Sequence, residues 1–109
     1  MRATRVARMD SQSRVAAFVD ENELDAPAAY RLLDTVSELG EVAKEVCTST
    51  EYGSDPDSVA VSEDELGDAL FTLLALCSEL DVDAGAALGT SISKYEDRLA
   101  RSDRAGSGE

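Results

Sequence analysis

The stretch SEDELGDALFTLLALCSEL, Ser62 to Leu80, predicts a helix and sets the class of the fold. Three consecutive carboxylates open it, where the helix dipole favours negative charge. Ser62 followed three residues later by Glu65 also forms a capping-box pattern. A fourth carboxylate, Asp68, is followed by a run that is apolar around nearly the whole helix, which predicts burial on most sides.

Three more helices are expected around this one, at residues 13–22, 27–48 and 83–101. Apolar residues recur in them at steps of three and four, which is typical of helices with one buried face. Pro27 suits a first helical position, and the segment between the second and third helices is rich in turn-forming residues. No segment has a strand pattern, so the predicted class is all-α.

One domain is predicted, from residue 13 to residue 101. Residues 1–12 are expected to be a disordered N-terminal extension and residues 102–109 a disordered tail. No apolar run reaches the length of a membrane span, and the N-terminus lacks the apolar core of a signal peptide. We therefore expect an intracellular, cytoplasmic protein with no membrane partner. Cys47 and Cys77 lie among apolar neighbours, which favours buried free thiols over a disulfide.

The chain has 23 acidic and 10 basic residues and a net charge of −13. This balance argues against nucleic-acid binding, which needs a basic surface. Lysine is scarce and aspartate abundant, as in acidic proteins adapted to high salt, where screening weakens self-repulsion. A solvated acidic surface without a specific role is therefore an alternative for every carboxylate considered below.

Four carboxylates line one side of the second helix, opposite its apolar face: Asp34, Glu38, Glu41 and Glu45. They repel one another, and an acidic solvent face explains them as well as a site does. The third helix favours a site, because Glu65 and Asp68 share a strip of an otherwise apolar element. Burying unpaired carboxylates is costly, and oxygen ligands from facing helices suit Mg²⁺ or Mn²⁺.

Other site chemistries find no support in the sequence. The chain has no histidine, which excludes histidine zinc sites and Ser-His-Asp triads. Asp55 and Asp57 begin like a calcium loop, but apolar residues follow where the next ligands belong. Gly40 and Gly67 interrupt the second and third helices, where close helix–helix approach is the expected reason.

The segments SELGEVAKEV and EDELGDALF resemble the two acidic motifs of the MazG-like nucleotide pyrophosphohydrolases, an all-α superfamily of nucleoside triphosphate pyrophosphatases. Glu38 and Glu41 match the first motif, E-x-x-E, and Glu65 and Asp68 match the second, E-x-x-D. The later segment KYEDR is similar to the Lys-aromatic-x-x-Arg motif of the family. The resemblance covers residues 13 to 100, and Ile92 stands where members often carry an asparagine.

The resemblance implies a four-helix bundle whose core is completed by homo-oligomerisation, as a homodimer or a dimer of dimers. It also implies Mg²⁺-dependent cleavage of nucleoside triphosphates to the monophosphate and pyrophosphate, with Mn²⁺ as a substitute ion, in nucleotide-pool housecleaning. The implied metal ligands are Glu38, Glu41, Glu65 and Asp68, and either Glu38 or Glu41 would be the general base. The implied substrate-binding residues are Lys94, Arg98, Lys44 and Tyr95.

Two rival functions stay open on the sequence. One is a non-catalytic helical module that binds nucleotide or a partner protein through the same fold. The other is cleavage of a nucleotide-like substrate such as phosphoribosyl-ATP, which a related branch of the superfamily hydrolyses. The sequence does not indicate a base or sugar preference.

Overall fold

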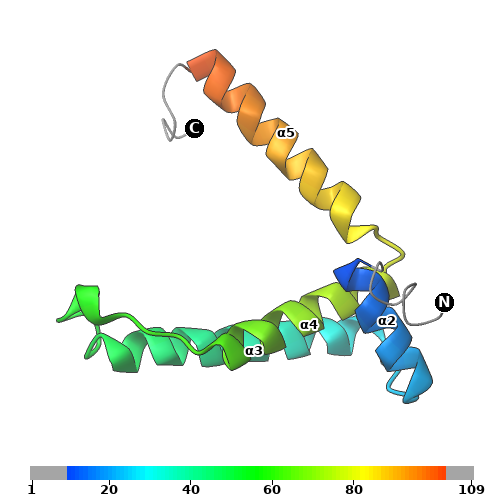
Figure 1. Ribbon diagram of the computed structural model, residues 1–109, viewed down its shortest axis with the longest axis horizontal. Coiled ribbons are helices and arrows are strands. Elements are labelled where there is room, and N and C mark those ends of the chain that lie inside the picture. The colour runs from blue at the N-terminus through cyan, green and yellow to red at the C-terminus, as the bar shows by residue number, and fades with distance from the viewer. Residues whose placement is uncertain (1–9, 103–109) are drawn as a thin grey trace.

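The computed structural model describes residues 10–102, which form four α-helices and one turn of 3₁₀ helix and contain no strand (Figure 1). The elements are α2 (Ser11–Glu21), α3 (Ala28–Ser49), η1 (Pro56–Ser58), α4 (Glu63–Glu79) and α5 (Ala84–Ser102). The predicted all-α class is confirmed. Helices α3 and α4 form a long antiparallel hairpin, α2 packs across α4, and α5 projects away from the hairpin.

The first helix begins earlier than predicted. Asp10 caps α2 by accepting a hydrogen bond from the backbone N–H of Ser13 at 2.7 Å, and this bond lowers the pKa of the Asp10 carboxyl. The folded part therefore starts before residue 13, because a cap and a first turn precede the apolar pattern. The rest of the predicted N-terminal extension, and the predicted tail from residue 103, lie outside the described residues.

The contact between α3 and α4 is built from small and polar side chains. Thr35 and Arg31 of α3 are buried, as are Ala69 and Thr72 of α4. The short side chains of Thr35, Ala69 and Thr72 let the two helices approach closely. On the other side of α4, Phe18 of α2 packs edge-to-face on Phe71, with ring centroids 6.0 Å apart.

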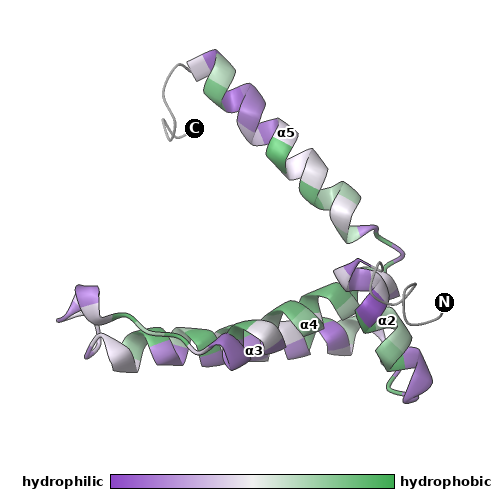
Figure 2. Ribbon diagram, in the orientation of Figure 1, coloured by the Kyte–Doolittle hydropathy of each residue, from purple (hydrophilic) through white to green (hydrophobic). Residues whose placement is uncertain are grey.

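The prediction that α4 is buried on most sides is wrong for the single chain. Leu66, Leu70 and Leu73 of α4 are about half exposed. The apolar face of α3 is also open to solvent at Leu32, Val36 and Leu39. The reason is that α5, which was expected to complete a four-helix bundle, does not cover the hairpin (Figures 1 and 2).

Two smaller predictions need correction for the same reason. Both cysteines are free, as predicted, but Cys47 is exposed and Cys77 only half-buried. A Cβ added to Gly40 or Gly67 would meet no atom of another element within 4 Å, so none of the helices in residues 10–102 approaches either glycine closely. These residues lie on helix faces that the single chain leaves uncovered.

A glutamine of α2 holds the short connection between α4 and α5. The side-chain amide of Gln12 donates to the carbonyl oxygen of Val82 at 2.7 Å and to the Ser78 hydroxyl at 3.2 Å. Its Oε1 accepts the backbone N–H of Ala84, at the first turn of α5, at 2.7 Å. This three-bond clamp fixes where α5 leaves the rest of the fold. None of the described helices is long and apolar enough to cross a bilayer.

Candidate metal centre

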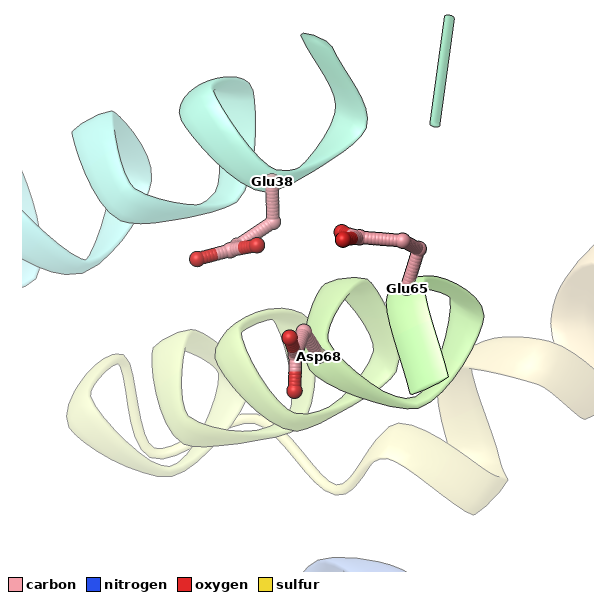
Figure 3. Close-up of side chains that lie close together, drawn as sticks. All are labelled: Glu38, Glu65 and Asp68. Atoms are coloured by element: carbon pink, nitrogen blue, oxygen red, sulfur yellow. The ribbon is translucent and has the colours of Figure 1, made fainter. Parts of the chain in front are cut away.

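The hairpin brings three of the predicted ligands together. One carboxylate oxygen each from Glu38, Glu65 and Asp68 lies within 4.8 Å of the other two. Glu38 reaches from α3 toward α4, the Glu65 carboxylate of α4 extends toward it, and Asp68 lies beside them on α4 (Figure 3). The two glutamates are half-buried and Asp68 is exposed, so the cluster opens to solvent on the Asp68 side.

Helical spacing explains this arrangement from each side. Glu65 and Asp68 are three residues apart, so both side chains lie on one strip of α4. Glu38 is three residues after Thr35, whose burial marks the face of α3 that contacts α4. Glu38 is therefore the residue of the first acidic motif that joins the cluster, because it lies on the face of α3 that contacts α4.

The N-terminus of α4 leaves Glu65 free to take part in this cluster. The Ser62 hydroxyl accepts the Glu65 backbone N–H at 3.1 Å, which is the first half of a capping box. In a complete capping box the Glu65 carboxylate would fold back onto the Ser62 N–H. Here Glu45 of α3 occupies that N–H instead, with its Oε1 2.8 Å from the Ser62 nitrogen. The Glu45 carboxylate thus caps α4, and the Glu65 carboxylate faces the cluster.

The electrostatics of the cluster centre on Glu65. Partial burial, followed by the neighbouring carboxylates of Glu45, Asp68 and Glu41, raises the pKa of Glu65 above its usual value. Within residues 10–102, the one ion pair joins Arg31 and Asp34, with the guanidinium nitrogen and the carboxylate oxygen 3.7 Å apart. Glu38, Glu65 and Asp68 form no ion pair with a basic side chain of the described residues, and such a cluster of carboxylates is suited to a cation.

The donor set fits a hard divalent ion. All three donors are carboxylate oxygens, the ligand type that Mg²⁺ and Mn²⁺ prefer. Opposite ligands of an octahedral Mg²⁺ lie about 4.2 Å apart, at about 2.1 Å from the ion. Oxygens that are within 4.8 Å of one another therefore need only small side-chain rotations to close on an ion, with water and phosphate oxygens in the remaining positions.

Replacing Glu45 tests whether Glu45 caps α4 and thereby leaves Glu65 free to join the cluster. Glu45→Ala removes the acceptor of the Ser62 N–H, so we expect Glu65 to fold back as the cap and leave the cluster. Mg²⁺ affinity, measured by titration calorimetry, should then fall severalfold, and the free energy of unfolding should fall by about 1 kcal/mol. Glu45→Gln keeps an acceptor oxygen and is the matched control. Equal Mg²⁺ affinities for Glu45→Ala and Glu45→Gln would contradict this role of Glu45.

The raised pKa of Glu65 predicts a pH dependence of stability in metal-free protein. Because the folded state holds the Glu65 proton more tightly, protonation stabilises the fold below the usual pKa of 4.5. This contribution is lost as the pH rises through the folded-state pKa. Urea unfolding at a series of pH values from below 4.5 upward, with chelator present, should show this loss of stability in the unaltered protein and not in Glu65→Gln. Saturating Mg²⁺ should remove the difference in pH dependence between the two proteins. Parallel curves of stability against pH for the two proteins in chelator would rule out this contribution of Glu65.

Other predicted site residues lie apart from the cluster within one chain. Glu41 is exposed on α3 and does not belong to the three-carboxylate group, and Lys44 is exposed on the same helix. Lys94 and Arg98 flank the Tyr95 ring on α5, with Nζ 5.9 Å and Cζ 5.3 Å from its centroid. Helix α5 leaves the far end of α4, about 16 Å along the axis from Asp68 at 1.5 Å per residue, and points away (Figure 1).

The role of Glu45 was missed in the sequence. Glu45 was predicted to lie in the acidic stripe of the second helix, but the sequence pattern did not distinguish its role from that of the other carboxylates in the stripe. A signal was present in the serine at the start of the next helix, whose N–H needs an acceptor that a neighbouring acid can supply. Comparisons with family models, curated proteins and solved structures find no match to this chain, so the family resemblance stays a prediction.

Proposed function

We propose that this protein is a Mg²⁺-dependent pyrophosphohydrolase that cleaves nucleoside triphosphates to the monophosphate and pyrophosphate. The observation that carries the proposal is the meeting of two acidic motifs that are distant in sequence. Glu38 from the first motif faces Glu65 and Asp68 from the second, across the α3–α4 contact. A solvent face would have no reason to direct carboxylates from two helices at one another, since their mutual repulsion destabilises the fold.

The metal ligands in this proposal are the three carboxylates of the cluster. When bound there, Mg²⁺ supplies positive charge that neutralises a triphosphate and activates a water molecule. The exposed side of the cluster, at Asp68, is where the phosphate chain can approach. The half-buried glutamates on the other side limit the entry of bulk water and hold the ligand geometry.

Glu41 is the general base in this proposal, which decides between the two glutamates that the sequence left open. It lies one turn from Glu38 on the same helix but outside the cluster, and its carboxylate is exposed. It is close enough to contribute to the raised pKa of Glu65. In the reaction, Glu41 takes a proton from the attacking water. The water oxygen bonds to the α-phosphorus, and the bond between the α-phosphorus and the α–β bridging oxygen breaks, so that this oxygen leaves with pyrophosphate.

The proposal includes assembly as a homodimer or a dimer of dimers in an intracellular setting. Half-exposed leucines along both helices of the hairpin support assembly, because a surface of this kind is typical of protein interfaces. Lys94, Arg98, Lys44 and Tyr95 remain the proposed substrate-binding residues, with the cations directed at phosphate oxygens.

A nucleotide panel tests the activity directly. Purified protein is incubated with standard and modified nucleoside triphosphates and with phosphoribosyl-ATP, in low and high salt, with Mg²⁺, Mn²⁺ or chelator. Release of pyrophosphate that depends on the metal is the expected result. Orthophosphate release or no release across the panel would reject the proposal. Metal-independent nucleotide binding in calorimetry would then favour the non-catalytic module.

A further inference from the structure

Helix α5 is attached to the rest of the fold near its first turn. Gln12 accepts the Ala84 N–H there, and within residues 10–102 no hydrogen bond or ion pair joins residues 88–101 to another helix. Figure 1 shows α5 standing clear of the hairpin beyond its first turn. The direction of this 19-residue helix therefore depends on the few residues that connect it to α4.

Both ends of this connection are closed by bonds of the adjoining helix. After α4, the Asp81 N–H donates to the Ser78 carbonyl at 3.1 Å, and Asp81 has a φ of 56°. The Val82 N–H donates to the Cys77 carbonyl at 2.9 Å, which completes the Schellman pattern of a helix end. At the start of α5, the Asp83 carboxylate accepts a backbone N–H of the first turn at 3.0 Å, as an N-cap does.

The Gln12 side chain bridges the stretch that these bonds leave free, from Val82 to Ala84. Its amide donates to the Val82 carbonyl and its Oε1 accepts the Ala84 N–H, each at 2.7 Å. These two groups lie on either side of Asp83, so a rotation about the backbone of Asp83 would break at least one of the two bonds. Gln12 is itself held in place, because α2 packs on α4.

Helix α5 acts as a lever on this clamp. Arg98 is 14 residues from Ala84, about 21 Å along the axis, so a tilt of about 10° moves it by about 4 Å. A shift of this size breaks a charge-assisted hydrogen bond, whose two heavy atoms are about 2.7–2.9 Å apart. Lys94 and Arg98 both lie against the Tyr95 ring, so the direction of α5 is the main variable in where these cations lie.

We propose that Gln12 is a positioning residue that sets the direction of α5 and thereby the place where Lys94 and Arg98 meet the triphosphate. The clamp holds the two cations in one place before nucleotide binds, so less conformational freedom is lost on binding. Gln12 lies outside the carboxylate cluster and acts through α5. The effect on nucleotide binding rests on the proposed function, whereas the control of α5 does not.

Distances between spin labels on α3 and α5 test the control of α5 without nucleotide or metal. In a chain carrying Cys47→Ser and Cys77→Ser, labels are attached at Ser37→Cys and Asp97→Cys, both exposed. Dilution with unlabelled protein limits the measurement to pairs within one chain. Gln12→Met keeps the length of the side chain without its hydrogen bonds, and its distance distribution should be broader by about 4 Å than with Gln12. Equal widths would overturn the proposal.

Two variants separate the clamp from a general effect on α2. Asn22→Ala removes an amide hydrogen bond at the other end of α2, to the Phe18 carbonyl at 2.9 Å, and should keep the narrow distribution. Gln12→Glu keeps an acceptor for the Ala84 N–H but cannot donate to the Val82 carbonyl, so its width should be intermediate. A broad distribution in Asn22→Ala would overturn the assignment to Gln12. Circular dichroism establishes that each variant keeps its helices.

Nucleotide kinetics test the consequence for substrate binding. In Gln12→Met the KM for a cleaved nucleoside triphosphate should rise about tenfold, with kcat and the Mg²⁺ affinity within about twofold of the unaltered protein. Gln12→Glu should restore part of the loss. An unchanged KM beside a broadened distance distribution would overturn the positioning role. If the unaltered protein cleaves no nucleotide, the proposed function fails, and the label distances still decide whether Gln12 directs α5.

Discussion

Asp68→Asn is expected to lower metal-dependent pyrophosphate release by about 100-fold or more. The substitution keeps the size of the side chain but removes one of the three charges that would hold the ion. Loss of roughly 3 kcal/mol of transition-state stabilisation corresponds to this factor, since each 1.36 kcal/mol changes a rate tenfold. The same variant should bind Mg²⁺ more weakly in calorimetry and gain less thermal stability from it.

The matched control is Asp64→Asn, one turn earlier on α4. Asp64 is exposed, undergoes the same change of charge, and lies outside the three-carboxylate cluster. Its activity and Mg²⁺ affinity should stay within about twofold of the unaltered protein, because surface charges act weakly through solvent. If both variants lose activity equally, the acidity of the whole helix matters and the proposed metal site is wrong.

Arg31→Ala is expected to have the largest effect on stability. Arg31 is 8% exposed, and its guanidinium donates to the carbonyl oxygen of Leu24, which ties the α2–α3 connection to α3. Losing this charged hydrogen bond and the packing of the side-chain stem should cost about 3 kcal/mol. For a domain of about 100 residues, that lowers Tm by roughly 12 °C or more. Urea and thermal unfolding measure both quantities.

Three further variants separate the causes of this effect. Arg31→Lys keeps the charge without the planar fork and should lose less stability, and it remains measurable if the alanine variant does not fold. Asp34→Ala should have little effect, because its carboxylate is 3.7 Å from Arg31 and about half exposed. Arg14→Ala, on the exposed surface of α2, should be near neutral. An alanine variant at Arg31 no less stable than Arg14→Ala would disprove the role of Arg31.

The helices could be predicted from the sequence because their signals are local. The Ser62 cap, the position of Pro27 and the steps of three and four residues each act within one or two turns. They placed the ends of α3, α4 and α5 within about two residues of the structure. The two acidic motifs could be found for the same reason, since each is confined to one turn of helix.

The faces of the helices could not be assigned in the same way. The sequence predicted that the apolar side of α3 would meet the core, but the structure buries Arg31 and Thr35 and leaves Leu32, Val36 and Leu39 exposed. Rotating a helix about its axis changes none of its internal hydrogen bonds, so the local pattern cannot fix the rotation. Small side chains on α4, such as Ala69, permit the close contact that selects this face.

The sequence by itself determined the all-α class, the positions of the helices and the two acidic motifs. The tertiary structure decided that Glu38 meets Glu65 and Asp68, that Glu45 caps α4, and that α5 leaves the hairpin under the clamp of Gln12. The physical reason is range. Helix formation depends on neighbours within a few residues, whereas the meeting of side chains depends on contacts between segments that are tens of residues apart.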